Sequence, residues 1–291
     1  MTESPISAVL AVDGGGTRCR MACEVDGVVH SIETGAANVS TDFEGALVQI
    51  RAGVDEISRR LGVEEKAMRN WPSFIGLAGV TDERIAGQLR DALGLTCARI
   101  EDDRPAAVRG ALGAQDGMIA HCGTGSFLAL QEGGQMRFAG GWGPVLGDEA
   151  SAQWVGRRSL SEALCAYDGT RSATGLTEKL LADLDGPAGL VRFAGMATPT
   201  QLGALAPEVT SAAQGGDAVA EGILQDGADY IAKTAARLGW HPGRVICLTG
   251  GIAPFYAPYL PEDMQAAISV PLAEPLSGAL ALAKEVQHEH H

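Results

Sequence analysis

Two glycine-rich turns, at Gly15 and, 108 residues further along, at Gly123, constrain the fold of this chain more than any other feature. Each turn follows a short apolar segment and leads into a second strand-like segment and a hairpin turn. The recurrence of this order is typical of an internal repeat. The sequence therefore predicts two related α/β halves.

The pattern of apolar residues predicts alternating strands and helices in both halves. In the first half we expect strands at 6–12, 18–25, 28–32, 73–78 and 96–100, and helices at 42–61, 82–93 and from Pro105 onwards. In the second half we expect strands at 117–121, 127–130, 136–139 and 244–248, and helices at 147–167, in much of the sequence up to 239, and at 275–286. The Asp26-Gly27 turn between the second and third strands is a strong hairpin signal.

The same pattern divides the chain into two domains, with a boundary near residues 104–116. We assign residues 1–110 to an N-terminal domain and residues 111–291 to a C-terminal domain with helical insertions. The last helix, at about 275–286, is able to pack back on the N-terminal domain.

The charge of the chain argues against several classes of partner. The sequence has 22 Lys and Arg against 36 Asp and Glu, a formal net charge of −14, which repels nucleic acid and anionic lipid. No apolar run reaches the roughly 18 residues of a membrane span, and the N-terminus lacks the basic start of a signal peptide. The six cysteines are scattered without a CxxC pair, as in a reduced protein. We therefore expect a cytoplasmic protein with neither nucleic-acid nor membrane partners.

Three glycine turns each follow an apolar strand: Asp13–Thr17, Gly123–Ser126 and Gly250-Gly251. Glycine lets the backbone approach an anion closely, and such turns leave backbone N–H groups free to bind it. The turns match neither the GxxxxGK[ST] nor the GxGxxG pattern. Their shared context favours nucleotide phosphates over three ordinary turns.

Four segments occur in a distinctive order: DGGGTR at 13–18, GTGS at 123–126, GGWG at 140–143 and GDEASA at 147–152. They resemble the BadF/BadG/BcrA/BcrD ATPase family, and within it the N-acetylglucosamine kinase and glucosamine kinase branch. The resemblance covers nearly the whole chain and implies an α/β fold of two ribonuclease H-like domains, the actin-like ATPase fold, with a central interdomain cleft. It also implies a homodimer.

ATP and Mg²⁺ are the cofactors that the resemblance implies. Asp13 is expected to hold Mg²⁺ through water, because hard cations prefer oxygen ligands and Mg²⁺ keeps much of its own water. The residues expected to bind ATP are Gly15, Gly16, Thr17, Thr124, Ala213, Gly250 and Gly251.

Asp103 is the candidate general base of phosphoryl transfer. A carboxylate can orient a sugar hydroxyl and take its proton as the new bond forms. In similar sugar kinases this acid ends the strand before the interdomain helix, where Asp103 lies. Asp102 competes for the role, since adjacent strand residues point to opposite faces, and a helix-capping acid is the structural alternative.

A small-molecule sugar is the acceptor that the resemblance implies. Its expected contacts are Asn38, Asp103, Ser126, Gly141, Trp142, Gly143 and Asp148. Trp142 can supply an apolar wall or be a core residue, and Asp148 can also stabilise a helix N-terminus. Animal N-acetylglucosamine kinases have Asn after the GTGS turn, but this chain has Phe127, which cannot form hydrogen bonds with a sugar or an acetamido group.

The leading hypothesis is an ATP-dependent amino-sugar kinase that phosphorylates the 6-hydroxyl of N-acetylglucosamine or of a close relative such as glucosamine. The first alternative is an ATP-driven activator of a radical dehydratase or reductase. That branch holds an iron–sulfur cluster through cysteines near the domain junction, but no cysteine lies between Cys97 and Cys122 here. The second alternative is a non-catalytic sugar sensor, since a fold alone does not establish an activity.

Overall fold

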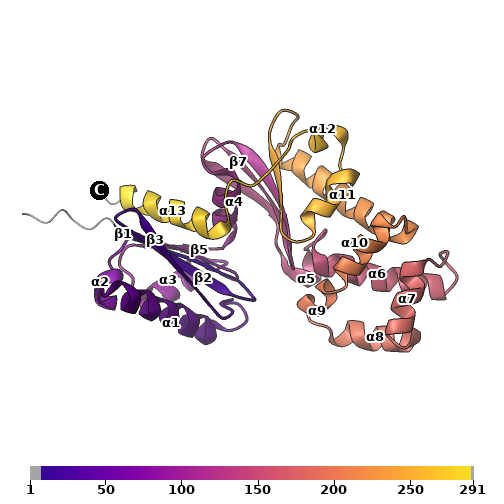
Figure 1. Ribbon diagram of the computed structural model, residues 1–291, viewed down its shortest axis with the longest axis horizontal. Coiled ribbons are helices and arrows are strands. Elements are labelled where there is room, and N and C mark those ends of the chain that lie inside the picture. Colours follow the sequence, from indigo (N-terminus) through magenta and orange to yellow (C-terminus); the bar gives the residue numbers. More distant parts are fainter. Residues whose placement is uncertain (1–7, 290–291) are drawn as a thin grey trace, which may run out of the picture. The chain divides into compact units, whose positions relative to one another are not determined.

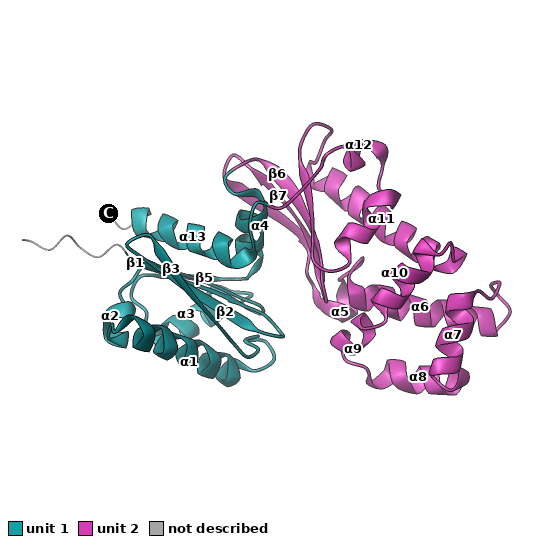
Figure 2. Ribbon diagram, viewed as in Figure 1, with its two compact units in different colours: residues 1–114, 272–291 teal, residues 115–271 magenta. Residues whose placement is uncertain are grey.

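The computed structural model describes residues 8–289, which fold into two compact units. Figure 2 shows one unit, residues 1–114 with 272–291, in teal and the other, residues 115–271, in magenta. We refer to them as unit 1 and unit 2. Unit 2 begins at residue 115, and the C-terminal segment from residue 272 is part of unit 1.

Unit 1 is built on a five-stranded mixed sheet of order β3-β2-β1-β4-β5. Its strands are β1 (Ala8–Gly14), β2 (Cys19–Val25), β3 (Val28–Thr34), β4 (Ser73–Leu77) and β5 (Ala98–Glu101). The first three are antiparallel neighbours, whereas β4 and β5 run parallel to β1. The carboxyl ends of β1, β4 and β5 therefore meet at one edge of the sheet.

Helices cover both faces of this sheet. They are α1 (Phe43–Leu61), α2 (Glu65–Met68), α3 (Glu83–Leu93), α4 (Arg104–Leu112) and α13 (Pro275–Glu289). The side chains of Asp42 and Asp82 cap α1 and α3 by accepting hydrogen bonds from backbone N–H groups at 2.8 and 2.9 Å. Figure 1 shows α13 across the face opposite α1 and α3.

The contact between α13 and α4 depends on two glycines. A Cβ on Gly278 would lie 2.1 Å from the carbonyl oxygen of Ala106, and one on Gly110 would lie 2.6 Å from that of Glu274. The close approach buries a separate apolar cluster between these helices and the sheet. Its members include Val9, Ala11, Ala22, Phe74, Ala106, Ala279 and Leu282.

Unit 2 repeats the topology of unit 1 in a second five-stranded sheet of order β10-β9-β6-β7-β8. Its strands are β6 (Gly117–Cys122), β7 (Ser126–Glu132), β8 (Gln135–Gly140), β9 (Ile246–Thr249) and β10 (Ile268–Ser269). Antiparallel β6, β7 and β8 correspond to β1, β2 and β3, and parallel β9 and β10 correspond to β4 and β5. The internal repeat and the mixed α/β fold class are confirmed.

The helices of unit 2 form one large apolar core with the second sheet. They are α5 (Gly143–Leu146), α6 (Ala152–Tyr167), α7 (Gly175–Asp183), α8 (Gly186–Met196), α9 (Pro199–Gly203), α10 (Ala206–Gln214), α11 (Ala218–Leu238) and α12 (Glu262–Gln265), with a 3₁₀ helix at Ala253–Tyr259. Of these helices, α11 lies against β7 and β8. Tyr256 lies fully buried in this core, and its hydroxyl donates to the carbonyl oxygen of Ala150 at 2.8 Å.

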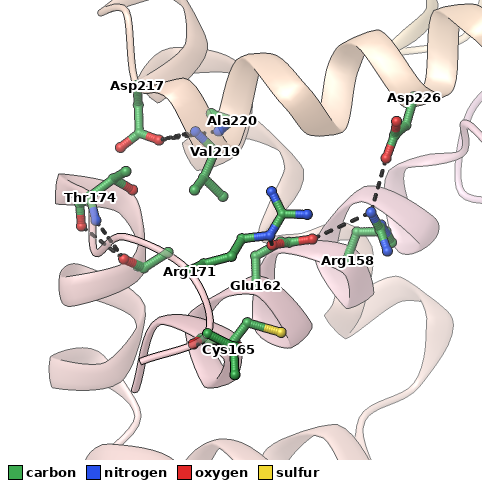
Figure 3. Close-up of polar contacts among 11 residues, drawn as sticks. Arg158, Glu162, Cys165, Arg171, Thr174, Asp217, Val219, Ala220 and Asp226 are labelled. Carbon is green, nitrogen blue, oxygen red and sulfur yellow. Dashed lines mark hydrogen bonds and ion pairs between the residues drawn. The ribbon is translucent and has the colours of Figure 1, made fainter. Parts of the chain in front are cut away.

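Polar contacts tie the helices of unit 2 together (Figure 3). The Asp217 carboxylate accepts hydrogen bonds from Val219 and Ala220 at the start of α11 and from Leu176 at the start of α7. Burial alone would raise the pKa of Asp217, but these N–H donors hold it below its usual value. Buried Glu162 on α6 pairs with Arg171 at 2.6 Å, and these contacts fix the helices that support the loop before α6.

One expected helix begins later than its sequence pattern predicts. We expected a helix over 147–167, but α6 begins at Ala152, after the N-cap Ser151. Asp148 and Ala150 have positive φ angles of 60° and 65°, so residues 147–151 form a loop. Asp148 therefore does not lie in the first turn of α6.

Candidate active site

Asp13 lies at the carboxyl end of β1, opposite Arg20 on β2. Arg20 donates to Asp13 Oδ2 from Nε at 3.1 Å and from Nη2 at 2.5 Å. Burial raises the pKa of Asp13 although Arg20 acts to lower it. Asp13 is thus a largely buried carboxylate whose charge is already balanced by one guanidinium.

Asp103 follows β5 and immediately precedes α4. Between β1 and β5 lies β4, where Gly76 is in register with Asp13 and Glu101. A Cβ on Gly76 would lie only 3.2 Å from the Cα of Asp103, so glycine gives the start of α4 room at this edge. Desolvation, followed by the negative charges of Asp102 and Asp13, raises the pKa of Asp103 to about 7.

The structure separates the two competing acids by their contacts. Asp102 Oδ1 accepts hydrogen bonds from the backbone N–H of Arg104 at 2.9 Å and from its Nε at 2.5 Å. The Asp103 side chain does not cap α4 and, within the described part of the chain, accepts no hydrogen bond from another side chain. The helix-capping alternative for Asp103 is therefore wrong, and Asp103 is the acid whose carboxylate is left available.

The glycine turn after β1 is closed by a hydrogen bond from the Gly15 N–H to the Arg18 carbonyl oxygen at 2.9 Å. Gly16 and Thr17, at its tip, are exposed. The Gly15 carbonyl oxygen accepts from Ala37 at 2.9 Å, which brings Asn38 beside this turn. Asn38 Oδ1 accepts from both the N–H and the hydroxyl of Ser40.

The glycine turn after β6 is built in the same way. The Gly123 N–H donates to the Gly125 carbonyl oxygen at 2.9 Å, and Thr124 is exposed at the tip. The Gly123 carbonyl oxygen accepts from Ala152 at 2.8 Å, which joins the turn to the start of α6. Each unit thus presents one exposed turn of the type that binds phosphate.

Asp148 lies against this second turn and is only 6% exposed. Burial, the larger effect, raises the pKa of Asp148, whereas the nearby backbone N–H groups of Ser126 and Gly143 act to lower it. A Cβ on Gly125 would lie 2.9 Å from Asp148 Oδ2. The Ser126 hydroxyl donates to the Glu149 carbonyl oxygen at 2.5 Å, so the expected acceptor-site residues Ser126, Gly143 and Asp148 form one cluster.

Trp142 and Phe127 differ sharply in burial. Trp142 is 74% exposed between Gly141 and Gly143, both at positive φ, so the alternative of a core tryptophan is wrong. Phe127 is 9% exposed and stacks on His121, with the two ring centroids 5.2 Å apart. Burial lowers the pKa of His121 to about 4, which keeps its ring neutral beside Phe127.

A cavity of about 440 Å³ opens beside the second glycine turn within unit 2. Its lining residues are Gly123, Thr124, Ala152, Gly203, Ala206, Pro207, Thr210, Gly251, Ile252 and Phe255. Gly251 lines it, whereas Ala213 lies one turn further along α10 and is buried in the core. The sequence analysis did not predict that α9 and Phe255 line this cavity. In the sequence, α9 lies near Ala213 and Phe255 lies near the Gly250-Gly251 turn, and this proximity is the feature that could have indicated them.

We expect substitutions of the two glycines of the third turn to have different effects, one on ATP binding and the other on stability. A Cβ on Gly251 meets nothing within 4 Å, so Gly251→Leu should fold normally, fill the cavity and weaken ATP binding about tenfold or more. A Cβ on Gly250 would lie 2.3 Å from the Cys122 carbonyl oxygen at a φ of +87°, so Gly250→Ala should cost about 2–4 kcal/mol of unfolding free energy. Calorimetric titration with ATP and urea unfolding measure the two effects.

Gly222 provides the matched control, because it lies on α11, outside the cavity lining, and also has open space around its Cβ. Gly222→Leu should leave ATP affinity unchanged. Unaltered ATP affinity in Gly251→Leu would contradict the expectation that Gly251 lies at the ATP site.

Comparison with known proteins identifies the family. Residues 10–280 match the sequence profile of the BadF/BadG/BcrA/BcrD ATPase family. This chain belongs to the BadF/BadG/BcrA/BcrD ATPase family. Among the described residues, no helix is long and apolar enough to cross a membrane.

Relatives of this BadF/BadG/BcrA/BcrD ATPase extend over almost its full length. Glucosamine kinase GspK of Vibrio cholerae is 27% identical over 286 residues, covering 96% of each chain. The N-acetylmuramic acid/N-acetylglucosamine kinase of Clostridium acetobutylicum is 25% identical over 76% of this chain and 75% of its own length. A solved structure of a candidate N-acetylglucosamine kinase from Chromobacterium violaceum is 29% identical, with a TM-score of 0.82, covering 96% of this chain and 99% of that one.

Proposed function

We propose that this protein is an ATP-dependent amino-sugar kinase that transfers a phosphoryl group to the 6-hydroxyl of a hexosamine, glucosamine or N-acetylglucosamine. The observation that carries the proposal is Asp103, a carboxylate with a pKa near 7 that accepts no side-chain hydrogen bond in the described part of the chain. The family and the kinases to which the chain is similar support the same conclusion.

Asp103 acts as the general base in this proposal. Phosphoryl transfer requires alignment of the attacking oxygen more than covalent help. The carboxylate accepts a hydrogen bond from the acceptor hydroxyl, orients its oxygen and takes its proton as the oxygen–phosphorus bond forms. A pKa near 7 suits this role, because the group is partly ionised at neutral pH and still holds the proton that it receives.

The residues around Asp13 fit a magnesium ion that arrives with ATP. No cluster of three or more His, Cys, Asp or Glu side chains in residues 8–289 could hold a metal by itself. Mg²⁺ bound to phosphates needs only one or two carboxylates, because it keeps several waters. Burial raises the pKa of Asp13, and a bound cation supplies the charge that stabilises its anion. Asp13 would hold the ion, which neutralises phosphate charge during transfer.

Backbone N–H groups of the two exposed turns would bind the phosphates, at Gly16 and Thr17 in unit 1 and at Thr124 in unit 2. The Gly15 N–H already donates to Arg18, so Gly15 would contribute by letting the phosphate approach the backbone closely. The cavity beside Gly251 would accept the adenosine, since most of its lining is apolar. Asp148 and Asn38 offer a carboxylate and an amide to sugar hydroxyls, and exposed Trp142 offers an apolar surface to the ring. Ala213 would support the adenosine cavity from the core.

Phe127 bears on the choice of acceptor. A buried phenyl ring stacked on a neutral imidazole cannot form a hydrogen bond with an acetamido group. We therefore propose that glucosamine is a better acceptor than N-acetylglucosamine, as judged by kcat/KM. We further propose a cytoplasmic homodimer. The net charge of −14 supports the proposal that it has no nucleic-acid or membrane partners.

Acceptor-dependent ADP release from Mg·ATP tests the function directly. The acceptors are glucosamine, N-acetylglucosamine, N-acetylmannosamine, N-acetylmuramic acid and glucose. We expect glucosamine to stimulate ADP release at least about 100-fold over the rate without sugar, because a positioned hydroxyl replaces water. ATP binding with no stimulation by any amino sugar would refute the kinase and favour a sensor.

A further inference from the structure

Arg20 lies between two carboxylates of unit 1. Its Nε and Nη2 both donate to Asp13 Oδ2, and its Nη1 lies 3.6 Å from Glu274 Oε2. The side chains of Arg20 and Asp13 are 20% and 12% exposed, whereas that of Glu274 is 81% exposed. One guanidinium thus has a buried partner and, within reach, a solvated one.

The contact to Asp13 occupies Oδ2, one of the two carboxylate oxygens that a metal-bound water could use. An arginine with two donors on one carboxylate oxygen is a strong, charge-assisted contact. A divalent cation close to Asp13 would also repel the guanidinium. This repulsion weakens the Arg20–Asp13 interaction when magnesium arrives, and a largely buried arginine left without a partner is costly.

Glu274 lies where its carboxylate can pair with Arg20 when magnesium binds near Asp13. Its carbonyl oxygen accepts hydrogen bonds from Ser277 and Gly278 at 3.0 and 3.2 Å, so its backbone is fixed at the start of α13. Its carboxylate has no other ion pair in the described part of the chain. A small change in the side-chain torsions of Arg20 or Glu274 closes a gap of 3.6 Å to hydrogen-bonding distance.

We infer that Arg20 is a positioning residue. It holds the Asp13 carboxylate in place before nucleotide binds, and it exchanges this ion pair for one with Glu274 when Mg·ATP binds. This inference rests on the proposed function. Arg20 and Glu274 then set how much Mg²⁺ the protein needs to bind ATP, without touching the reacting atoms.

The test measures ATP affinity by calorimetry over a series of free Mg²⁺ concentrations. In Glu274→Gln, Arg20 has no charged second partner, so the Mg²⁺ concentration that gives half of the maximal increase in ATP affinity should rise about three- to fivefold, the scale of one solvated ion pair. In Arg20→Met, Asp13 is already free, so this concentration should fall by a similar factor. Arg20→Lys should restore an intermediate value.

A double variant distinguishes the change of Arg20 from Asp13 to Glu274 from a general effect of charge on Mg²⁺ binding. With Arg20→Met in place, adding Glu274→Gln should change nothing, because the exchange no longer exists. A general charge effect would instead add the two single shifts. Glu285→Gln makes the same change of charge further along α13, where Glu285 pairs with Arg109 at 2.9 Å, and should leave the Mg²⁺ requirement unaltered.

The outcomes distinguish this inference from the proposed function. If the wild-type protein binds no ATP at any Mg²⁺ concentration, the kinase proposal fails. If it binds ATP in a Mg²⁺-dependent way but the two substitutions add, or if Glu274→Gln has no effect, the exchange of Arg20 is refuted and the kinase proposal stands. Arg20→Met can lower stability, so Glu274→Gln, at an exposed side chain, remains an independent test.

Discussion

Replacing Asp103 by asparagine is expected to reduce sugar-dependent turnover about 10³-fold or more, while ATP affinity stays within about twofold. Asparagine keeps the shape of the side chain but cannot take the proton of the acceptor hydroxyl. A coupled assay of ADP release and calorimetric titration with ATP measure the two quantities. Ionised Asp103 is destabilising in its buried site, so the variant should be at least as stable as the wild type at pH 8.

Asp102→Asn is the matched control, because the Asp102 carboxylate is already engaged by Arg104. We expect it to lose less than about tenfold in turnover, the scale of one indirect contact. If Asp102→Asn lost turnover and Asp103→Asn kept it, the roles of the two acids would be exchanged.

The pH dependence follows from the pKa of about 7 for Asp103. The carboxylate must be unprotonated to accept a proton, so kcat/KM should fall below about pH 7 and approach a tenfold loss per pH unit. The pKa lies above the ordinary value, so the folded state binds this proton more tightly than the unfolded state does. The contribution of Asp103 to stability therefore decreases as the pH rises from about 4 to about 7.

Asp148→Asn is expected to lower kcat/KM for the sugar about 100-fold, with ATP affinity unchanged. A hydrogen bond from a substrate hydroxyl to a buried carboxylate contributes about 1.5–3 kcal/mol, and a neutral amide weakens it. Asparagine also tolerates the left-handed backbone at φ 60°, so the loop should persist. Steady-state kinetics with varied sugar measure the loss.

Glu149→Gln is the control for Asp148, because Glu149 is a half-buried neighbour whose carboxylate takes part in no hydrogen bond or ion pair in the described part of the chain. It should alter kcat/KM by less than about threefold. Equal losses in the two variants would show that the charge of the loop, rather than Asp148, governs sugar binding.

Features encoded in short stretches could be predicted from the sequence. The strand–turn–strand repeat was identified from Gly15 and Gly123, and the two sheets have corresponding strand orders. The cap at Asp42 follows from local chemistry, because a side-chain carboxylate next to the first turn accepts its free N–H groups.

Features that depend on distant contacts could not be predicted in this way. The sequence pattern predicts a helix over residues 147–151, but the structure has a loop there. The hydroxyls of Ser126 and Tyr256, both distant in sequence, donate to the carbonyl oxygens of Glu149 and Ala150 in this loop. The cavity lining combines α9, α10 and the 3₁₀ helix, which no local pattern connects. The contact between Arg104 and the Asp102 carboxylate, which leaves Asp103 as the proposed base, also has no signal in the local sequence.

The return of α13 to unit 1 has a consequence for synthesis on the ribosome. Residues 1–114 emerge with Val9, Ala11 and Phe74 on a sheet face that α13 later covers. All of unit 2 must be made before Leu282 can reach that face, whereas unit 2 is continuous and can complete its core first. A nascent chain stalled anywhere within unit 2 therefore keeps an apolar surface that chaperones recognise.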